Sequence, residues 1–363
     1  MKVTVVGAGI MGLCSAHALK KRGCDIQIID RGPIPNPSSS SLDHHRLIRH
    51  MYGTQTGYAR LVPAAFDSWT SLFDDLGKSR FVQTGCLSIG RTDTSWAERS
   101  ISMLRESGIE YQILNLSQAR RRYPWLRFQP ADSMVYTPEG GILLADEILE
   151  DLTSHLVKNG AVLIPDCHIS TFQGTDVISE DGRIFESDHA VIALGAWHPE
   201  YFSSPIRSSR QIIGRIHTPP SNLCIESQCP MVLDIDTDRG FYFVPGSSSF
   251  PAKFGDHHKH SYQSPDSDRT VSQDEQEEIA RLADYRFMES DQIAIDDYGV
   301  CYYSMAPNDS VLLEHQSGSL SISGGSGHSF KWGPLFGRLI AEVILGSREY
   351  DVVRDVIAGR HGM

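Results

Sequence analysis

Two short runs of β-branched residues lie near the start of the chain, at residues 3–6 (VTVV) and 26–30 (IQIID). β-Branched side chains pack well on a pleated surface, so both runs favour strands. Residues 10–23 between them contain helix formers and end at a glycine that follows basic residues, which is a common helix stop. The pattern predicts a unit of strand, turn, helix and strand.

Helical periodicity returns several times further along the chain. Apolar side chains recur at helical spacing from Phe66 to Leu76, which predicts a core-facing helix over roughly residues 60–77. Ser272 and Glu275 have the spacing of a capping box and predict the start of an acidic helix. Other helices are expected near residues 96–106, 145–160 and 333–346.

Strand-rich segments alternate with these helices, so the chain is expected to pass between two domains more than once. Short β-rich runs begin after residue 80, and a buried strand that runs into a glycine turn is predicted at 189–197. The expected fold class is α/β, as a two-domain α+β chain. It combines a Rossmann-like dinucleotide-binding domain, residues 1–79, 138–207 and 296–363, with a β-sheet-rich substrate domain, residues 80–137 and 208–295.

Composition excludes several classes of protein. The 363 residues are 40% hydrophobic and 21% charged, as in an ordinary globular protein. A formal charge of -12 argues against nucleic-acid binding, which depends on clustered Lys and Arg. No apolar run approaches the roughly 20 residues that cross a bilayer, so no membrane association is expected.

The cysteines favour a reducing compartment. There are seven, an odd and sparse set that does not indicate a disulfide framework, so a cytoplasmic location is expected. Cys224 and Cys229 lie close in sequence, but no second pair completes a zinc site, and no metal is expected.

The first turn carries a dinucleotide-binding pattern. Gly7, Gly9 and Gly12 have the G-x-G-x-x-G register directly after a strand and at the start of a helix. These positions allow a tight turn, close approach to a pyrophosphate and close packing of helix on strand. The helix start at Ile10 and Met11 presents free N–H groups to the anion. Asp30 ends the second strand and is placed to accept from ribose hydroxyls, which leaves NAD or FAD and disfavours NADP.

Two later segments favour a flavin. Residues 191–197 (VIALGAW) resemble the strand and turn that close over the dinucleotide in two-domain flavoenzymes. Residues 321–334 form a second glycine-rich loop before the terminal helix, and a helix start is useful against the flavin pyrimidine. The candidate cofactor contacts in this loop are Gly325, Gly327, His328, Phe330 and Lys331.

Several separate motifs, in the same order along nearly the whole chain, resemble the monomeric sarcosine oxidase family of the D-amino-acid oxidase group. They are RLIRHMYG at 46–53, YFVPGSSSFPAKFGDH at 242–257, GVCYYS at 299–304 and GGSGHSFKWGP at 324–334. The resemblance fails at residues 41–45, where the family's histidine-glycine-aspartate lead-in is SLDHH. No role is therefore transferred to His44 or His45.

The resemblance implies FAD, attached covalently by a thioether from Cys301 to the flavin 8α-methyl carbon. It places Arg46 against the flavin and makes Arg49 and Lys331 the clamp for a substrate carboxylate. It also assigns oxygen activation to Lys253. Pocket positions are implied for Tyr242, His257 and Tyr303. The residues alone leave other interpretations open. Cys301 then is a packed core cysteine, Arg46 and Arg49 form surface salt bridges, and Lys253 is a solvated lysine. The two arginines lie either on a helical turn or in a loop.

The implied activity is oxidation of the C–N bond of an amino acid, a secondary amine in particular, to an imine that hydrolyses, with O2 reduced to H2O2. The expected protein is a monomer that binds a small anionic substrate. Three alternatives stay open: a flavin dehydrogenase with another electron acceptor, an NAD-dependent dehydrogenase, and a degenerate flavoprotein that serves as a binding subunit. Candidate substrates are sarcosine, N-methyltryptophan, pipecolate, other N-alkylated amino acids and amino-phosphonates.

Overall fold

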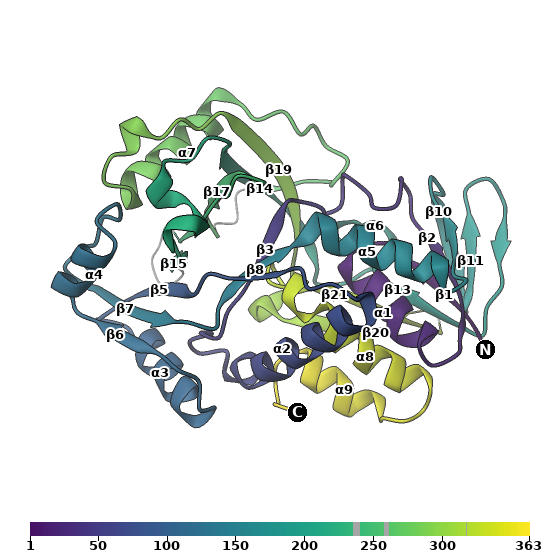
Figure 1. Cartoon of the computed structure of the whole chain (residues 1–363). Coiled ribbons are helices and arrows are strands. Elements are labelled where there is room, and N and C mark those ends of the chain that lie inside the picture. The colour runs from purple at the N-terminus through teal and green to yellow at the C-terminus, as the bar shows by residue number, and fades with distance from the viewer. Residues whose placement is uncertain (235–239, 258–260, 317) are drawn as a thin grey trace.

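A computed structural model describes residues 1–234, 240–257, 261–316 and 318–363. Its first elements are β1 (Lys2–Val6), α1 (Ile10–Lys20) and β2 (Asp25–Ile29), and the two strands pair in parallel. The predicted unit of strand, turn, helix and strand is confirmed. The α/β fold class is confirmed as well, because a largely parallel sheet and a mixed, mostly antiparallel sheet occupy different halves of the molecule (Figure 1).

The first half is built on a six-stranded sheet that holds the start of the chain at its centre. Only its edge strand β20 is antiparallel to its neighbour. In order across the sheet, the strands are β20 (Val311–Gln316), β21 (Ser319–Gly324), β13 (His189–Ile192), β1, β2 and β9 (Val162–Ile164).

Helices from distant parts of the sequence pack into one core beside this sheet. The helices predicted near 60–77, 145–160 and 333–346 are confirmed as α2 (Thr56–Leu76), α5 (Ala145–Lys158) and α8 (Gly333–Ile344). Helix α8 lies directly against α1, since a Cβ on Gly337 would be 2.5 Å from the carbonyl carbon of Cys14. The short helix α6 (His198–Tyr201) and the last helix, α9 (Tyr350–Ile357), complete this half.

The second half is a nine-stranded sheet with an aromatic core that includes Phe243, Phe254 and Phe287. The helices α3 (Trp96–Glu106), α4 (Leu116–Arg122) and α7 (Gln273–Arg286) lie on this half (Figure 1), and the predicted capping box of α7 is present. In order, the strands are β18 (Ser261–Tyr262), β14 (Arg207–Ile216), β17 (Ala252–Gly255), β16 (Phe241–Val244), β15 (Met231–Asp234), β5 (Cys86–Arg91), β7 (Asp132–Thr137) and β6 (Gln112–Leu114), with β19 (Asp297–Met305) also on β14.

Strand β19 connects the two halves of the molecule. It pairs antiparallel with β14 from Arg207–Met305 to Arg215–Asp297, and Cys301 lies opposite Gln211. This sheet therefore continues to Met305, past the domain boundary expected at residue 296. The division of the chain into two domains stays an interpretation of this arrangement.

Two three-stranded sheets complete the fold. One consists of β3 (His45–Ile48), β8 (Gly141–Leu144) and β4 (Phe81–Gln83), and the other of β10 (Ile169–Gln173), β11 (Asp176–Ser179) and β12 (Ile184–Phe185).

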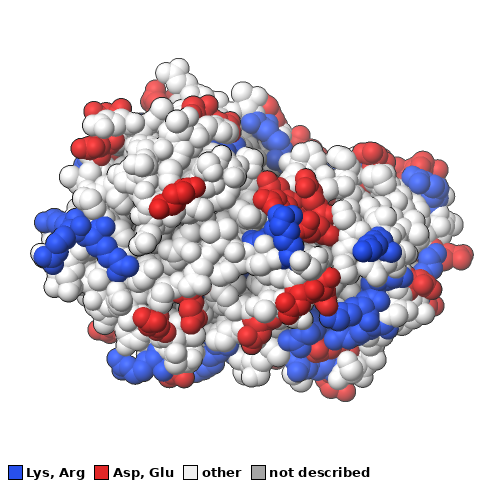
Figure 2. All heavy atoms as spheres, in the orientation of Figure 1, with Lys and Arg blue, Asp and Glu red and all other residues white. Residues whose placement is uncertain are grey.

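The surface mixes charges of both signs. On the face drawn in Figure 2, basic and acidic side chains are interspersed, apart from a blue group at the left over α4, which ends in Arg120, Arg121 and Arg122. Within the described ranges, none of the helices combines the length and the apolar character that crossing a membrane requires.

Candidate active site

One cavity of about 560 Å³ brings most of the predicted site residues together. Its walls come from the start of α1, the serine-rich loop, strands β3 and β19, and the glycine-rich loop before α8. The predicted residues that line it are Gly9, Ile10, Met11, Arg46, Arg49, Tyr242, Lys253, His257, Cys301, Tyr303, Gly327, His328, Phe330 and Lys331. Gly7, Gly12, Asp30 and Gly325 do not line it.

The glycine turn at one end of the cavity has the geometry that a dinucleotide fold needs. Gly7 has a φ of +100°, a conformation that favours glycine. A Cβ on Gly12 would lie 1.8 Å from the carbonyl oxygen of Gly7, so helix α1 could not start this close to β1 with a larger residue.

Serines that the sequence analysis did not select cover this helix start. The backbone N–H of Ile10 donates to Ser41 Oγ at 3.0 Å, and the hydroxyl of Ser40 donates to the carbonyl of Tyr302 on β19. Ser39, Ser40 and Ser41 all line the cavity. Their position in a Pro- and Ser-rich loop gave no sign that they would meet a helix start about 30 residues earlier.

Asp30 directly follows the last residue of β2, which ends one residue earlier than expected, and its carboxylate mainly organises the turn. It accepts from the backbone N–H groups of Ala8 at 2.7 Å and Gly32 at 3.0 Å, and from Asn36 Nδ2 at 2.8 Å. A carboxylate has about four acceptor positions, so one is left for a ribose hydroxyl. The ribose contact stays a prediction.

Elsewhere in the cavity wall, two buried basic side chains, Arg49 and Lys331, lie near one aromatic ring. The guanidinium carbon of Arg49 lies 4.2 Å, and the Nζ of Lys331 5.5 Å, from the ring centre of Tyr52. Arg49 Nε and Nη1 make no hydrogen bond to any described residue, and Lys331 Nζ donates to the carbonyl of His328 at 3.3 Å. Buried cations are normally paired, so this pair suits an anion that enters the cavity.

The electrostatics of Lys331 agree with that assignment. Lys331 is 3% exposed, and burial, followed by the nearby charge of Arg49, holds the pKa of its ammonium group well below the usual range. No carboxylate among the described residues forms an ion pair with Arg49 or Lys331. An anion placed between them would lower the cost of both buried charges.

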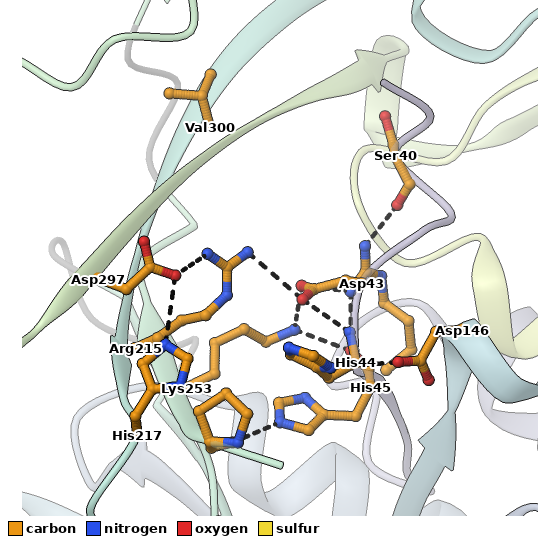
Figure 3. Close-up of polar contacts among 12 residues, drawn as sticks. Ser40, Asp43, His44, His45, Asp146, Arg215, His217, Lys253, Asp297 and Val300 are labelled. Atoms are coloured by element: carbon orange, nitrogen blue, oxygen red, sulfur yellow. Dashed lines mark hydrogen bonds and ion pairs between the residues drawn. The ribbon is translucent and has the colours of Figure 1, made fainter. Parts of the chain in front are cut away.

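A different arrangement surrounds Lys253, as Figure 3 shows. Its Nζ donates to Asp43 Oδ2 at 2.7 Å and to the carbonyl of His45 at 2.8 Å. Arg46 Nη1 donates to the same Asp43 oxygen at 2.7 Å, and Arg215 Nη2 lies 3.5 Å from Asp43 Oδ1. Burial, partly offset by Asp43, lowers the pKa of Lys253 to about 8.

Asp43 was missed in the sequence because it belongs to the SLDHH segment, where the family resemblance fails. The same cluster explains the different environments of the two arginines. The helical-turn alternative for them is wrong, and the loop alternative is wrong for Arg46: Arg46 lies on strand β3, and Arg49 directly follows that strand. Arg46 bonds Asp43, whereas Arg49 contacts Tyr52.

Cys301 lies on β19 at the wall of the cavity, half-buried and unpaired. Burial raises the pKa of its thiol, and the neighbouring Arg46 guanidinium acts in the opposite direction. Burial is the larger effect, so the protonated thiol is favoured, and the charge of Arg46 limits how far the thiolate, the reactive form of a cysteine, is disfavoured.

The remaining wall is apolar with phenol groups. The ring centres of Tyr242 and His257 are 5.4 Å apart. Burial raises the pKa of Tyr242 and Tyr303 above the usual range, so both phenols are neutral at physiological pH. Apolar lining residues are Leu47, Trp96, Ile213, Leu233 and Val244.

These residues fit an FAD molecule. The glycine turn at the helix start, the thiol of Cys301 and the cations Lys253 and Arg46 all border the same cavity. The unbonded donors of Arg49 lie in the same space and would face a substrate beside the ring. The volume exceeds what a small substrate alone requires.

Comparisons with known sequences agree. A family model described as FAD dependent oxidoreductase matches residues 2–343. Monomeric sarcosine oxidase from Bacillus sp. (strain NS-129) is 22% identical over 366 residues, covering 96% of this chain and 94% of the relative. N-methyl-L-tryptophan oxidase from Yersinia pestis (strain Pestoides F) is 21% identical over 349 residues, covering 93% of each chain.

Solved structures share the fold. L-proline dehydrogenase from P. horikoshii superposes with a TM-score of 0.84 at 20% identity, covering 99% of this chain and 97% of the other. NikD, an amino acid oxidase of nikkomycin biosynthesis, gives a TM-score of 0.81 at 19% identity, with 97% and 96% covered. Glycine oxidase from Geobacillus kaustophilus gives 0.80 at 19% identity, with 96% and 95% covered.

Proposed function

Because this chain belongs to the family of FAD-dependent oxidoreductases, we propose that it oxidises the C–N bond of an amino acid that carries a secondary amine, and reduces O2 to H2O2. The observation that carries the proposal is the pair of buried cations, Arg49 and Lys331, in the cavity that also holds Lys253 and Cys301. Sarcosine and N-methyltryptophan are the first substrates to test, since the relatives named above are oxidases of these two compounds.

Arg49 and Lys331 would bind the substrate carboxylate. Arg49 offers a planar fork with unbonded N–H groups, and Lys331, which lies near the same Tyr52 ring, supplies a second cationic group. Holding the carboxylate at two points orients the carbon next to the amine, which is a proximity effect. The apolar wall and the neutral phenols of Tyr242 and Tyr303 exclude water from the amine end.

When bound, FAD supplies the oxidation of the C–N bond and the return of the electrons to O2. The glycine turn and the serine loop would hold its pyrophosphate, Arg46 and the loop before α8 its ring, and Cys301 would attach it covalently. Flavin that stays with the polypeptide after acid precipitation in the parent protein, but is released from Cys301→Ser, would support the attachment. Release from both proteins would contradict it.

Lys253 holds a fixed positive charge at the cavity wall, which favours O2 as the electron acceptor. The experiment is a peroxide-coupled screen across N-substituted amino acids, with Lys253→Met compared in parallel. We expect the variant to retain flavin and to reoxidise far more slowly in air. Unchanged oxygen reactivity would remove Lys253 from the mechanism.

A second candidate, a flavin dehydrogenase that passes electrons to a quinone or a protein, is favoured by one observation: the carboxylate of Asp43 bonds the ammonium group of Lys253, so the ion pair as a whole has no net charge. Slow reoxidation of the reduced protein in air, together with rapid turnover with an artificial quinone, would select this function.

A monomeric state and a cytoplasmic location stay parts of the proposal. Analytical ultracentrifugation tests the monomeric state.

A further inference from the structure

The segment in which the sequence departs from its family places a carboxylate at the centre of the cations around Lys253. Asp43 is buried together with Lys253, whose side chain is 5% exposed against 7% for that of Asp43. Asp43 comes from the loop before β3, and Lys253 lies on β17, 210 residues later in the chain. The contact therefore joins two segments that lie far apart in the sequence (Figure 3).

The geometry points to Asp43 as a positioning residue for Lys253: we propose that it fixes the ammonium group at the cavity wall and supplies the negative charge that keeps it protonated. This inference deepens the proposed function and rests on it. Two of the three N–H groups of Lys253 are directed by Asp43 and the carbonyl of His45, at 2.7 and 2.8 Å. The third is left for the cavity.

The charges around the Lys253 ammonium group support the same role for Asp43. Arg46 and Arg215 both face the same carboxylate, so without Asp43 a buried ammonium group would face two guanidinium groups. Arg215 has a second carboxylate partner, Asp297, at 2.8 Å, whereas Asp43 is the one acidic group that contacts Lys253 among the described residues. Burial next to like charges favours the neutral amine, and an adjacent carboxylate favours the ammonium form.

Other titratable groups around Lys253 do not replace Asp43. Burial lowers the pKa of His45 to about 3, so its ring is neutral at physiological pH, and burial raises the pKa values of the Cys301, Tyr242 and Tyr303 groups. The charged or titratable side chains that interact with the ammonium group from the packed elements are Asp43, His45 and Arg46 from the β3 segment, Arg215 from β14 and Cys301 from β19. The phenols of Tyr242 on β16 and Tyr303 on β19 lie near Cys301.

The first test measures the lysine itself. Competitive labelling of the holoenzyme with acetic anhydride across pH, quantified on the Lys253 peptide by mass spectrometry, gives the protonation midpoint without any turnover. We expect Asp43→Asn to lower that midpoint by at least one pH unit. Asp297→Asn, which removes a carboxylate from the same cluster without touching Lys253, should shift it less. An unchanged midpoint in Asp43→Asn would overturn the inference.

The second test connects the lysine to oxygen. Because a charged Lys253 is lost as pH rises through its pKa, air reoxidation of Asp43→Asn should be at least about fivefold slower than the parent at pH 8 and recover at pH 6. Asp43→Glu keeps the negative charge, so its dependence of reoxidation on pH should match that of the parent. This variant is also the one to measure if Asp43→Asn does not fold. A shifted labelling midpoint with an unshifted reoxidation profile would refute the oxygen role of Lys253 and leave the Asp43 assignment standing. Reoxidation slowed equally at every pH, with no midpoint shift, would reduce Asp43 to a structural residue.

Discussion

The guanidinium carbon of Arg49 lies 4.2 Å from the ring centre of Tyr52. Lys331 Nζ approaches the same ring to 5.5 Å, so Arg49 from the end of β3 and Lys331 from the terminal loop both lie against Tyr52. The face of an aromatic ring attracts a cation, but it is a weak substitute for an anion. The arrangement is therefore prepared for a carboxylate.

Replacing Arg49 tests that arrangement. Arg49→Met removes charge-assisted hydrogen bonds of about 1.5–3 kcal/mol, and we expect kcat/KM to fall about 10- to 100-fold, mainly through KM. Steady-state kinetics with an amino acid measure this. The matched control is an amine of the same shape without a carboxylate, for which the loss should be small. Equal losses for both compounds would show that Arg49 does not bind the carboxylate.

Lys331 should make anion binding depend on pH. Its pKa lies below the usual range because of burial and Arg49, and a bound carboxylate raises it again. Above the pKa of the free site, binding must take up a proton, so the affinity for a carboxylate inhibitor should fall as pH rises, by up to about tenfold per pH unit. Calorimetry in buffers of different ionisation enthalpy counts the protons. Lys331→Met should abolish the uptake; identical uptake in the variant would assign the proton elsewhere.

Gly9 and Gly12 allow a matched pair of variants in the dinucleotide turn. In Gly12→Ala the new methyl group would meet the Gly7 carbonyl oxygen at 1.8 Å, so the start of α1 must move. In Gly9→Ala its nearest contact is the Ser41 hydroxyl oxygen at 3.0 Å, which belongs to a side chain. We expect Gly12→Ala to lose both thermal stability and flavin, and Gly9→Ala to fold but bind flavin more weakly. Full flavin content in Gly12→Ala would contradict this assignment of the turn.

Arg286 is fully buried in the second half of the molecule, where it bonds two carboxylates from different strands. It donates to Asp132 at 2.7 Å and, through Nε, to Asp234 at 2.8 Å. Arg286→Met leaves two carboxylates in the interior without this partner, and we expect a loss of about 3–5 kcal/mol in the free energy of unfolding. Urea denaturation measures it. Arg91→Met, which removes an exposed ion pair with Asp93, is the control and should leave the midpoint unchanged.

Much of the fold follows from local signals. The runs at 3–6 and 26–30 became strands because β-branched side chains suit a sheet, and the apolar residues from Phe66 to Leu76 form a buried or partly buried face of α2. The acidic helix α7 begins at Gln273, directly after its N-cap Ser272, because the reciprocal hydrogen bonds between Ser272 and Glu275 satisfy N–H groups at the helix start. These interactions lie within a few residues of one another, so one stretch of sequence contains both partners.

The residues of the site could be predicted from the sequence only in part. Motif resemblance selected Arg49, Lys253, Cys301 and Lys331, and the structure brings them into one cavity. It did not select Asp43, because the family pattern is lost there, nor the serines that meet the start of α1. It also did not show that β19 would pair with β14, which places the thiol of Cys301 at the wall of the second sheet.

The sequence by itself determined the dinucleotide turn, the main helices and the types of side chain available for chemistry, because each depends on neighbours within a turn or a strand. Only the tertiary structure decided which charges meet. Asp43 accepts a hydrogen bond from Lys253, which lies 210 residues later in the chain. Arg49, three residues after Arg46, has no acidic partner among the described residues. Such pairings depend on how sheets pack and which groups they bury, and no spacing along a chain contains that information.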